Sequence, residues 1–144
     1  MSQTFNGTGG NIPEGNQWQN FTINVSNVGI IDCNFTLCVN ITHPWTADIG
    51  FRLIPPSGGN GINVSSDNGG SGNNYNNTCF EVGANIPIQD GDAPFNGTYI
   101  PEGNNNGFNF DDLIGTSADG NWTLRLKDDF FGFSGSLDSW SLNF

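Results

Sequence analysis

The sequence predicts an all-β protein of two antiparallel sheets packed face to face. Residues that favour helix interiors are scarce, whereas Asn, Gly, Asp, Ser and Pro, which favour turns, make up about half of the chain. Apolar and polar residues alternate over several short segments, as in strands with one buried face. No helical pattern is long enough to connect parallel strands, so an antiparallel β-sandwich is favoured. Periodicity alone leaves jelly-roll and immunoglobulin-like topologies open.

The length predicts a single domain over residues 1–144. A chain of this size buries about two-thirds of the surface that its unfolded form would expose. Leu, Ile, Val and Phe supply about a quarter of the residues, above the level of about 20% below which disorder is expected. The chain can therefore form a hydrophobic core.

The strongest alternation predicts one long strand over residues 31–41, with its odd-numbered residues facing inward. Similar alternation predicts strands over residues 21–25, 49–53 and 122–127, and shorter β candidates lie at 62–65, 78–82 and 97–100. In the last segment Trp140, Leu142 and Phe144 share one face, but Leu137 has the opposite parity. A bulge or bend near Asp138 would reconcile the two.

Strand parity also bears on the three cysteines. Cys33 and Cys38 are five positions apart on the predicted strand, so they point to opposite faces and are not expected to pair. Cys79 shares the outward parity of Cys38 because Phe80 is expected to face the core. Cys38–Cys79 is therefore the favoured disulfide if one forms, and three free thiols with Cys33 in the core remain the alternative.

The charge is strongly acidic, with a net charge of -11 and only Arg52, Arg125 and Lys127 as cationic side chains. Such a chain would be repelled by nucleic acid and by anionic membrane surfaces. No apolar run approaches the roughly 20 residues of a membrane-spanning helix. The N-terminus lacks the basic and apolar regions of a signal peptide, so Met1 is expected to be the start of an excised domain.

The residue content gives little support for a catalytic site or a zinc site. His43 is the only histidine, and beside Pro44 at the end of a predicted strand it is expected to be a hydrogen-bonded structural residue. One His and three scattered Cys do not give the close ligand spacing of a zinc site. The sequence therefore disfavours an enzyme.

The remaining candidate is a metal site formed by clustered oxygen donors, which are the ligands that Ca²⁺ prefers. Asp67 opens the loop of residues 67–74, where glycines would let backbone carbonyls converge beside Asp and Asn side chains. An ordinary solvated turn is the alternative for this loop. The other acidic candidates are Asp48, Glu81, Asp90 with Asp92, Asp111 with Asp112, and Asp128 with Asp129.

Several aromatic residues are candidates for a binding surface. Phe130, Phe131 and Phe133 occupy a Gly-containing turn before the last strand, where they would form either a docking patch or a loop folded over the open end of the sandwich. Trp122 and Trp140 fit the core by parity. Trp18 with Trp45, or Trp45 with Tyr75, could form a flat platform for sugar rings.

Ordered stretches along nearly the whole chain resemble the P domain, also called the P/Homo B domain, that follows the subtilisin-like catalytic domain in kexin, furin and related proteases. The stretches are NIPE at 11–14, VNITH at 39–43, DIGFRLIPPSG at 48–58, TCFE at 78–81, APFNGTYIP at 93–101, GNWTLRLKD at 120–128 and GSLDSWSL at 135–142. The tripeptide Thr46-Ala47-Asp48 replaces the Arg-Gly-Asp of many animal convertases. Val82 follows Glu81 where members often carry a second acidic residue.

This resemblance implies a jelly-roll β-sandwich without catalytic residues of its own. Such a domain would pack beside an N-terminally attached protease domain of a secreted bacterial enzyme, stabilise it and modulate its dependence on calcium and pH. Isolated, it is expected to be a monomer. The expected Ca²⁺ ligands are among Asp48, Asp67, Glu81, Asp128 and Asp129. The alternative function is a carbohydrate-binding or adhesion module, because jelly rolls serve those roles too.

Overall fold

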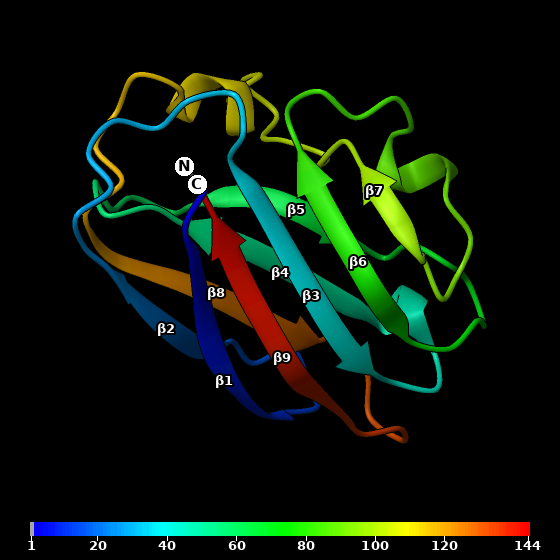
Figure 1. The fold of residues 1–144 in the computed structure, drawn as a ribbon. Coiled ribbons are helices and arrows are strands. Elements are labelled where there is room, and N and C mark those ends of the chain that lie inside the picture. The colour runs from blue at the N-terminus through cyan, green and yellow to red at the C-terminus, as the bar shows by residue number, and fades with distance from the viewer. Residues whose placement is uncertain (1) are drawn as a thin grey trace.

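The computed structural model describes residues 2–144, which form two β-sheets packed face to face (Figure 1). The all-β sandwich predicted from the sequence is confirmed. Neighbouring strands run antiparallel, except that β6 and β7 run parallel. One sheet contains, in spatial order, β1 (Thr4–Ile12), β9 (Gly135–Asn143), β3 (Thr36–Thr42), β6 (Tyr75–Glu81) and β7 (Gly97–Tyr99). The other contains β2 (Gln19–Val25), β8 (Gly120–Asp128), β4 (Ile49–Ile54) and β5 (Ile62–Ser66).

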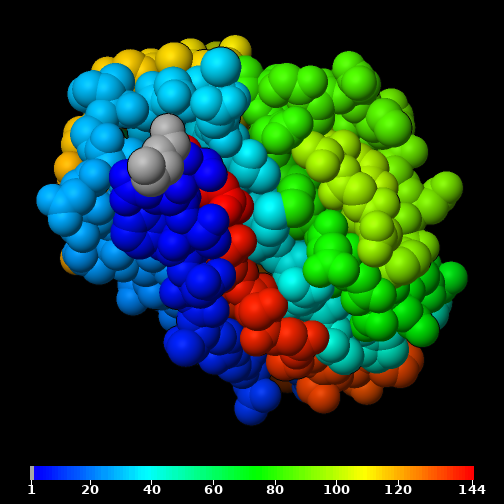
Figure 2. Space-filling model, in the orientation of Figure 1, coloured from blue at the N-terminus to red at the C-terminus, as the bar shows by residue number. Residues whose placement is uncertain are grey.

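Short 3-10 helices interrupt the connections between the strands. They are η1 (Thr46–Asp48), η2 (Ile88–Asp90) and η3 (Phe110–Leu113). The space-filling view looks onto the outer face of the five-stranded sheet, where the strands lie side by side across the surface (Figure 2). The inward side chains of both sheets form one apolar core that includes Trp122 and Trp140, as their parity predicted.

The predicted long strand over residues 31–41 is only partly right, because β3 begins at Thr36. The Asp32 carboxylate accepts a hydrogen bond from the backbone N–H of Asn34 at 2.8 Å and holds residues 32–35 in a turn. Cys33 is exposed in this turn, so the alternative that places it in the core is wrong. Ile31 and Phe35 are nevertheless buried on either side of the turn.

The favoured disulfide is confirmed. Cys38 on β3 lies directly opposite Cys79 on β6, their Cα atoms are 4.0 Å apart and their sulfurs are bonded. The bond joins two neighbouring strands on the outer face of the five-stranded sheet, since Leu37, Val39 and Phe80 face the core.

The predicted bulge in the last strand is also confirmed. Asn40 pairs with Ser139, but the next residue on β3, Ile41, pairs with Leu137. The extra residue on β9 is therefore Asp138, and the bulge lets Leu137 and Trp140 both reach the core.

The glycine-rich β1 is a strand that the alternation analysis did not predict. Glycine is required here by close approach: a Cβ at Gly7 would collide with the ring of Trp140, and one at Gly9 with the carbonyl of Leu137. The absent side chains remove the alternation that would have marked the strand. β1 pairs along its length with β9, so the chain begins and ends in neighbouring strands (Figure 1).

Candidate functional site

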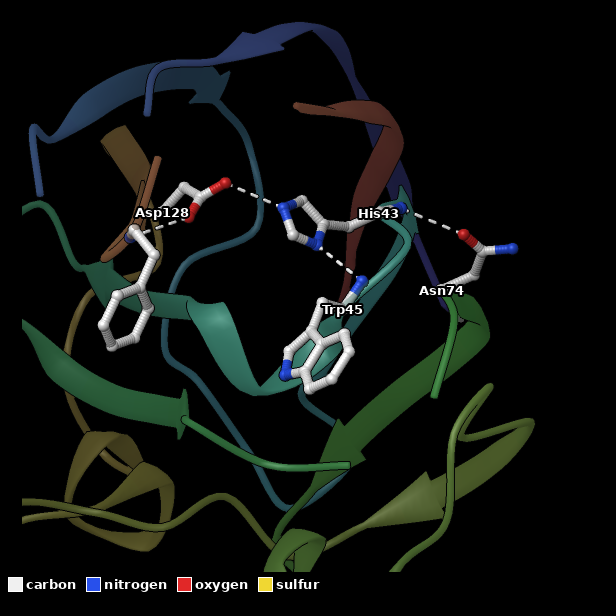
Figure 3. A network of polar contacts seen from close by, with 5 residues as sticks. His43, Trp45, Asn74 and Asp128 are labelled. Carbon is white, nitrogen blue, oxygen red and sulfur yellow. Dashed lines mark hydrogen bonds and ion pairs between the residues drawn. The ribbon is translucent and has the colours of Figure 1, made fainter. Parts of the chain in front are cut away.

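A buried polar pair closes the end of the sandwich opposite the chain termini. His43 follows the end of β3, Asp128 ends β8, and neither side chain is exposed to solvent. Their Nε2 and Oδ2 atoms are 2.7 Å apart (Figure 3). The backbone N–H of Phe130 donates to the other carboxylate oxygen, Oδ1, at 3.0 Å. Both oxygens of the buried carboxylate are thus hydrogen-bonded, as burial of a charge requires.

The hydrogen bonds of His43 define its tautomer. Nδ1 accepts from the backbone N–H of Trp45 at 3.0 Å, so this nitrogen carries no proton (Figure 3). The proton therefore lies on Nε2 and is donated to Asp128. Asn74 fixes the backbone here: its Oδ1 accepts from the N–H of His43 at 2.9 Å. The imidazole is a structural, fully hydrogen-bonded group, as the sequence predicted, and has no free nitrogen to activate a nucleophile.

Asp48 brings a second carboxylate to this pair. It lies at the end of η1 just before β4, and one oxygen of Asp48, one of Asp128 and a ring nitrogen of His43 all lie within 4.8 Å of one another. Burial raises the pKa of the Asp48 carboxyl, and the negative charge of Asp128 raises it further. Ionisation of Asp48 is therefore less favourable than that of an isolated, exposed aspartate.

Asp129 and Asp67 extend this group. The backbone N–H of Asp129 donates to the carbonyl of Asp48 at 2.8 Å, and that of Asp67 donates to the carbonyl of Ile49 at 3.1 Å. Partial burial raises the pKa of the Asp67 carboxyl to about 6, with further upward contributions from its hydrogen bond to Asp129 and from the charge of that residue. Lys127 is the nearby cation, with its Nζ 3.3 Å from Asp129 Oδ1.

Sheet topology explains why these residues meet. β4 and β8 are antiparallel neighbours in which Ile49 pairs with Asp128, so the start of one strand and the end of the other bring Asp48 and Asp129 together. β5 is the next strand, and Gly50 pairs with its last residue, Ser66, which places Asp67 at the same end. We call Asp48, Asp67, Asp128 and Asp129 the acidic cluster.

Glu81 lies apart from the acidic cluster. It ends β6, where it pairs with Thr36 at the beginning of β3, whereas His43 follows the end of β3. Glu81 instead lines a hollow of about 120 Å³ together with Asp111 and Pro101. The predicted ligand set is thus divided between the two ends of the sandwich, four residues at one and Glu81 at the other.

The donor chemistry of the acidic cluster fits a hard cation. The cluster has four carboxylates and one ion-paired lysine, Lys127, whose Nζ lies 3.3 Å from Asp129 Oδ1; this buried oxygen accepts no hydrogen bond from the described residues. Ca²⁺ prefers such oxygen donors, and the loop of residues 67–74 adds carbonyl groups nearby. His43 is unsuited to metal binding, because metal on Nε2 would require a proton on Nδ1, which faces the N–H of Trp45.

Sequence reasoning identified the carboxylates but missed the residues that organise them. Nothing in the sequence signalled that His43 would pair with Asp128, that Asn74 would hold its backbone, or that Lys127 would pair with Asp129. The sequence did show that each of these carboxylates lies beside the end of a predicted strand. To predict that they lie close together, one must also know which strands are neighbours in the sheet.

The aromatic candidates are distributed over different surfaces. Phe130, Phe131 and Phe133 are 60%, 80% and 47% exposed, and Phe133 stacks on Trp45 with ring centroids 6.2 Å apart. A platform of Trp45 and Tyr75 is wrong, because Tyr75 is fully buried and stacks on a core phenylalanine. Trp18 lies elsewhere, beneath the cationic groups of Arg125 and Lys127.

Within residues 2–144 the structure contains no helix long and apolar enough to span a membrane. Comparison with curated protein sequences gave no match. A family model described as the proprotein convertase P-domain matches residues 96–144. That segment contains β7, β8 and β9, and therefore Asp128 and Asp129 of the acidic cluster.

Similar solved structures come from the serine protease of Aeromonas sobria. The chain is 18% identical to that protease in its complex with the chaperone ORF2, with a TM-score of 0.59, and 18% identical to the protease crystallised separately, with a TM-score of 0.54. In both cases the match covers 99% of this chain and 26% of the other. This chain thus spans about a quarter of those proteins and shares the fold of that part. Residues 96–144 carry the P-domain pattern of proprotein convertases, and the resemblance predicted from the sequence is confirmed.

Proposed function

We propose that this chain is a non-catalytic accessory domain of a secreted bacterial serine protease of the subtilisin-like, proprotein convertase type. Its role would be to stabilise a catalytic domain attached at its N-terminus. The P-domain match over residues 96–144 carries this proposal, and the shared fold with part of a bacterial serine protease supports it. The hydrogen bonds that occupy both nitrogens of the single histidine are in keeping with a domain without catalytic residues.

The strand order supports the jelly-roll type and a single domain over residues 1–144. In a jelly roll, eight strands form two facing four-stranded sheets, and most connections between consecutive strands cross from one sheet to the other. Here the order β1-β9-β3-β6 faces the order β2-β8-β4-β5, and β7 extends the first sheet at its edge. The first and last strands pair with each other, so both ends of the chain contribute to one sandwich.

We further propose that the acidic cluster binds a structural Ca²⁺ ion. Asp48, Asp67, Asp128 and Asp129 would supply carboxylate oxygens, and the cation would offset the burial and the repulsion between carboxylates that together raise the pKa of Asp48 and Asp67. The ion would join the ends of β4, β5 and β8. Glu81 stays a separate candidate ligand, with Asp111 beside it in the same hollow.

A thermal melt of this chain tests the calcium proposal. Ca²⁺ that binds only the folded state at 100 times its dissociation constant stabilises it by about 2.7 kcal/mol. We therefore expect the midpoint to be several degrees higher in Ca²⁺ than in EGTA, and Asp129→Asn to abolish most of that difference.

Two variants serve as controls for the melt. Asp32→Asn removes a carboxylate at the other end of β3 but keeps the oxygen that accepts from Asn34, so it should retain the full calcium shift. Glu81→Gln should also retain it if the acidic cluster is the site. Identical midpoints in Ca²⁺ and EGTA for the unmodified chain would exclude the calcium proposal and leave the P-domain assignment intact.

A further inference from the structure

An open hollow of about 500 Å³ lies on the outer face of the five-stranded sheet, where three strand ends meet. β1 ends at Ile12, which pairs with Gly135 at the beginning of β9. Thr42 ends β3 and pairs with Ser136. In Figure 2 this region is at the lower edge of the sheet, between the end of β1 and the beginning of β9. Glu14 is the one charged residue in the lining of the hollow.

The carboxylate of Glu14 has no polar partner within residues 2–144. Glu14 is half-buried, yet it forms neither a hydrogen bond nor a salt bridge with the described residues. A cation attracts a partly buried carboxylate more strongly than a fully exposed one, because the protein screens the attraction less than water does. Glu14 is therefore an unused acceptor for a cation at the hollow.

The backbone around Glu14 is fixed by contacts to β8. Residues 14–16 form a bend, in which Gly15 and Asn16 have positive φ angles of 83° and 65°. The N–H of Asn16 donates to the carbonyl of Asp128 at 2.6 Å, and Lys127 Nζ donates to Asn16 Oδ1 at 3.0 Å. Because this bend is already anchored, little ordering of the backbone opposes binding at the hollow.

An exposed aromatic ring lies beside this bend. Phe131 is 80% exposed, and its ring lies so close to Gly15 that a Cβ there would be 2.4 Å from Phe131 Cζ. The same loop exposes Phe130 and Phe133. Exposed aromatic side chains are typical of protein interfaces, and the faces of their rings attract cations. The border of the hollow thus combines a carboxylate with an apolar ring.

The cation that Glu14 would accept does not come from this chain or from a second copy of it. Lys127 is ion-paired with Asp129 at 3.3 Å, and Arg52 and Arg125 lie on neighbouring strands of the other sheet. A second copy offers no other cationic side chain and brings its own net charge of -11, which opposes association. A different, basic polypeptide has the complementary charge.

We propose that the hollow binds an arginine or lysine side chain in an extended segment of another protein. Glu14 would pair with the cationic group, and the Phe131 ring would contact its methylene groups and an apolar neighbour in the segment. Asn11, Thr42 and Ser136 would supply hydrogen bonds to the backbone of the segment. The hollow has a volume within the range of about 300–1,000 Å³ that is usual for ligand sites. This site requires neither Ca²⁺ nor an attached protease.

An NMR titration of the isotopically labelled chain with acetyl-Ala-Leu-Arg-Leu-Ala-amide, in EGTA and physiological salt, tests this site. We expect saturable shifts of the amide signals of Gly15, Gly135 and Ser136. Glu14→Gln should weaken binding about tenfold or more, because it removes the counter-ion. Asp32→Asn is the matched control: it removes the same charge beyond the other end of β3 and should change the affinity by less than about twofold.

A second pair of variants tests the aromatic part of the site. Phe131→Ala should weaken binding of the peptide about threefold or more, because the ring no longer covers the methylene groups of the arginine. Phe108→Ala is its control, since it removes a 40% exposed ring that lines a different hollow, and it should leave the affinity unchanged.

Other outcomes would overturn the proposal. They are the absence of saturable shifts, equal affinity for a peptide with glutamine in place of arginine, and equal losses in Glu14→Gln and Asp32→Asn. Sedimentation with phosphatidylcholine vesicles without peptide binding would assign the exposed rings to a neutral membrane surface instead. Glu14→Gln should keep the melting midpoint of the free protein, since the carboxylate has no partner among the described residues. A lowered midpoint with unchanged peptide affinity would give Glu14 a structural role.

Discussion

His43 and Asp128 are both fully buried, so each depends on the other for its hydrogen bond at that position. His43→Ala would leave the Asp128 carboxylate with only the N–H of Phe130 as a donor. Removing one partner of a buried polar pair costs about 3–5 kcal/mol, and we expect a loss of this size in the free energy of unfolding. Urea denaturation of His43→Ala, Asp128→Ala and the double variant measures the pair as a cycle, in which the double variant should lose much less than the sum. Additive losses would contradict the coupling.

Asp67 should make the metal-free protein less stable as the pH rises. Its pKa is about 6 in the folded protein and near 3.8 when unperturbed, so the protonated form favours folding. This stabilising contribution is complete below about pH 4 and is lost as the pH rises through about 6. Asp67→Asn keeps an uncharged side chain at all pH values, so its melting midpoint relative to the unmodified chain should increase between pH 4 and pH 7 in calcium-free buffer.

Asp32→Asn provides the reference for the pH series, because this carboxylate is exposed and lies away from the acidic cluster. If the difference in melting midpoint between Asp67→Asn and the unmodified chain is independent of pH, or decreases between pH 4 and pH 7, the raised pKa of Asp67 is contradicted.

Strands β3 and β6 are joined covalently in addition to their hydrogen bonds. The Cys38–Cys79 bond closes a separation of 41 residues, and the chain-entropy argument gives a stabilisation of about 4 kcal/mol for a loop of that length, with measured values commonly about 2–4 kcal/mol. Replacing both cysteines by serine should lower the free energy of unfolding by that amount in guanidinium titrations. Cys33→Ser is the control, because this exposed thiol is free and its loss should change stability by less than about 0.5 kcal/mol.

Element prediction succeeded where one face of a strand is apolar and failed where other interactions determine the backbone. Alternation identified β2, β4 and β8 because every second residue enters the core. The predicted β3 was too long. The Asp32 carboxylate accepts a hydrogen bond from the N–H of Asn34 and forms a turn, although the alternating spacing of apolar residues continues through this segment. Alternation missed β1, whose glycines permit close packing against β9. The parallel placement of β7 depends on the long connection before it and has no local signal.

At the scale of the whole molecule, the sequence indicated which residue types make up the candidate site but not where they lie in the fold. The excess of carboxylates predicted an oxygen-lined cation site, and four of the five named residues meet at one end of the sandwich. The separation of Glu81 follows from the direction of β6, which runs away from that end. The proximity of Arg52 and Arg125 also had no signal in the sequence, because these two residues are neighbours only through the register of β4 and β8.

The pairing of β1 with β9 determines how the domain would respond to tension. Gln3 and Phe144 exchange backbone hydrogen bonds, so a force pulling the two ends of the chain apart acts first on this rung alone (Figure 1). The hydrogen-bonded pairs between antiparallel β1 and β9 then break one after another. They do not bear the load together, as they would if the two strands were pulled lengthwise past each other. In optical tweezers the domain should yield at a much lower force when held by its ends than when held through cysteines placed at Thr4 and Ser136, which load the same strands lengthwise. Similar forces in the two geometries would contradict this expectation.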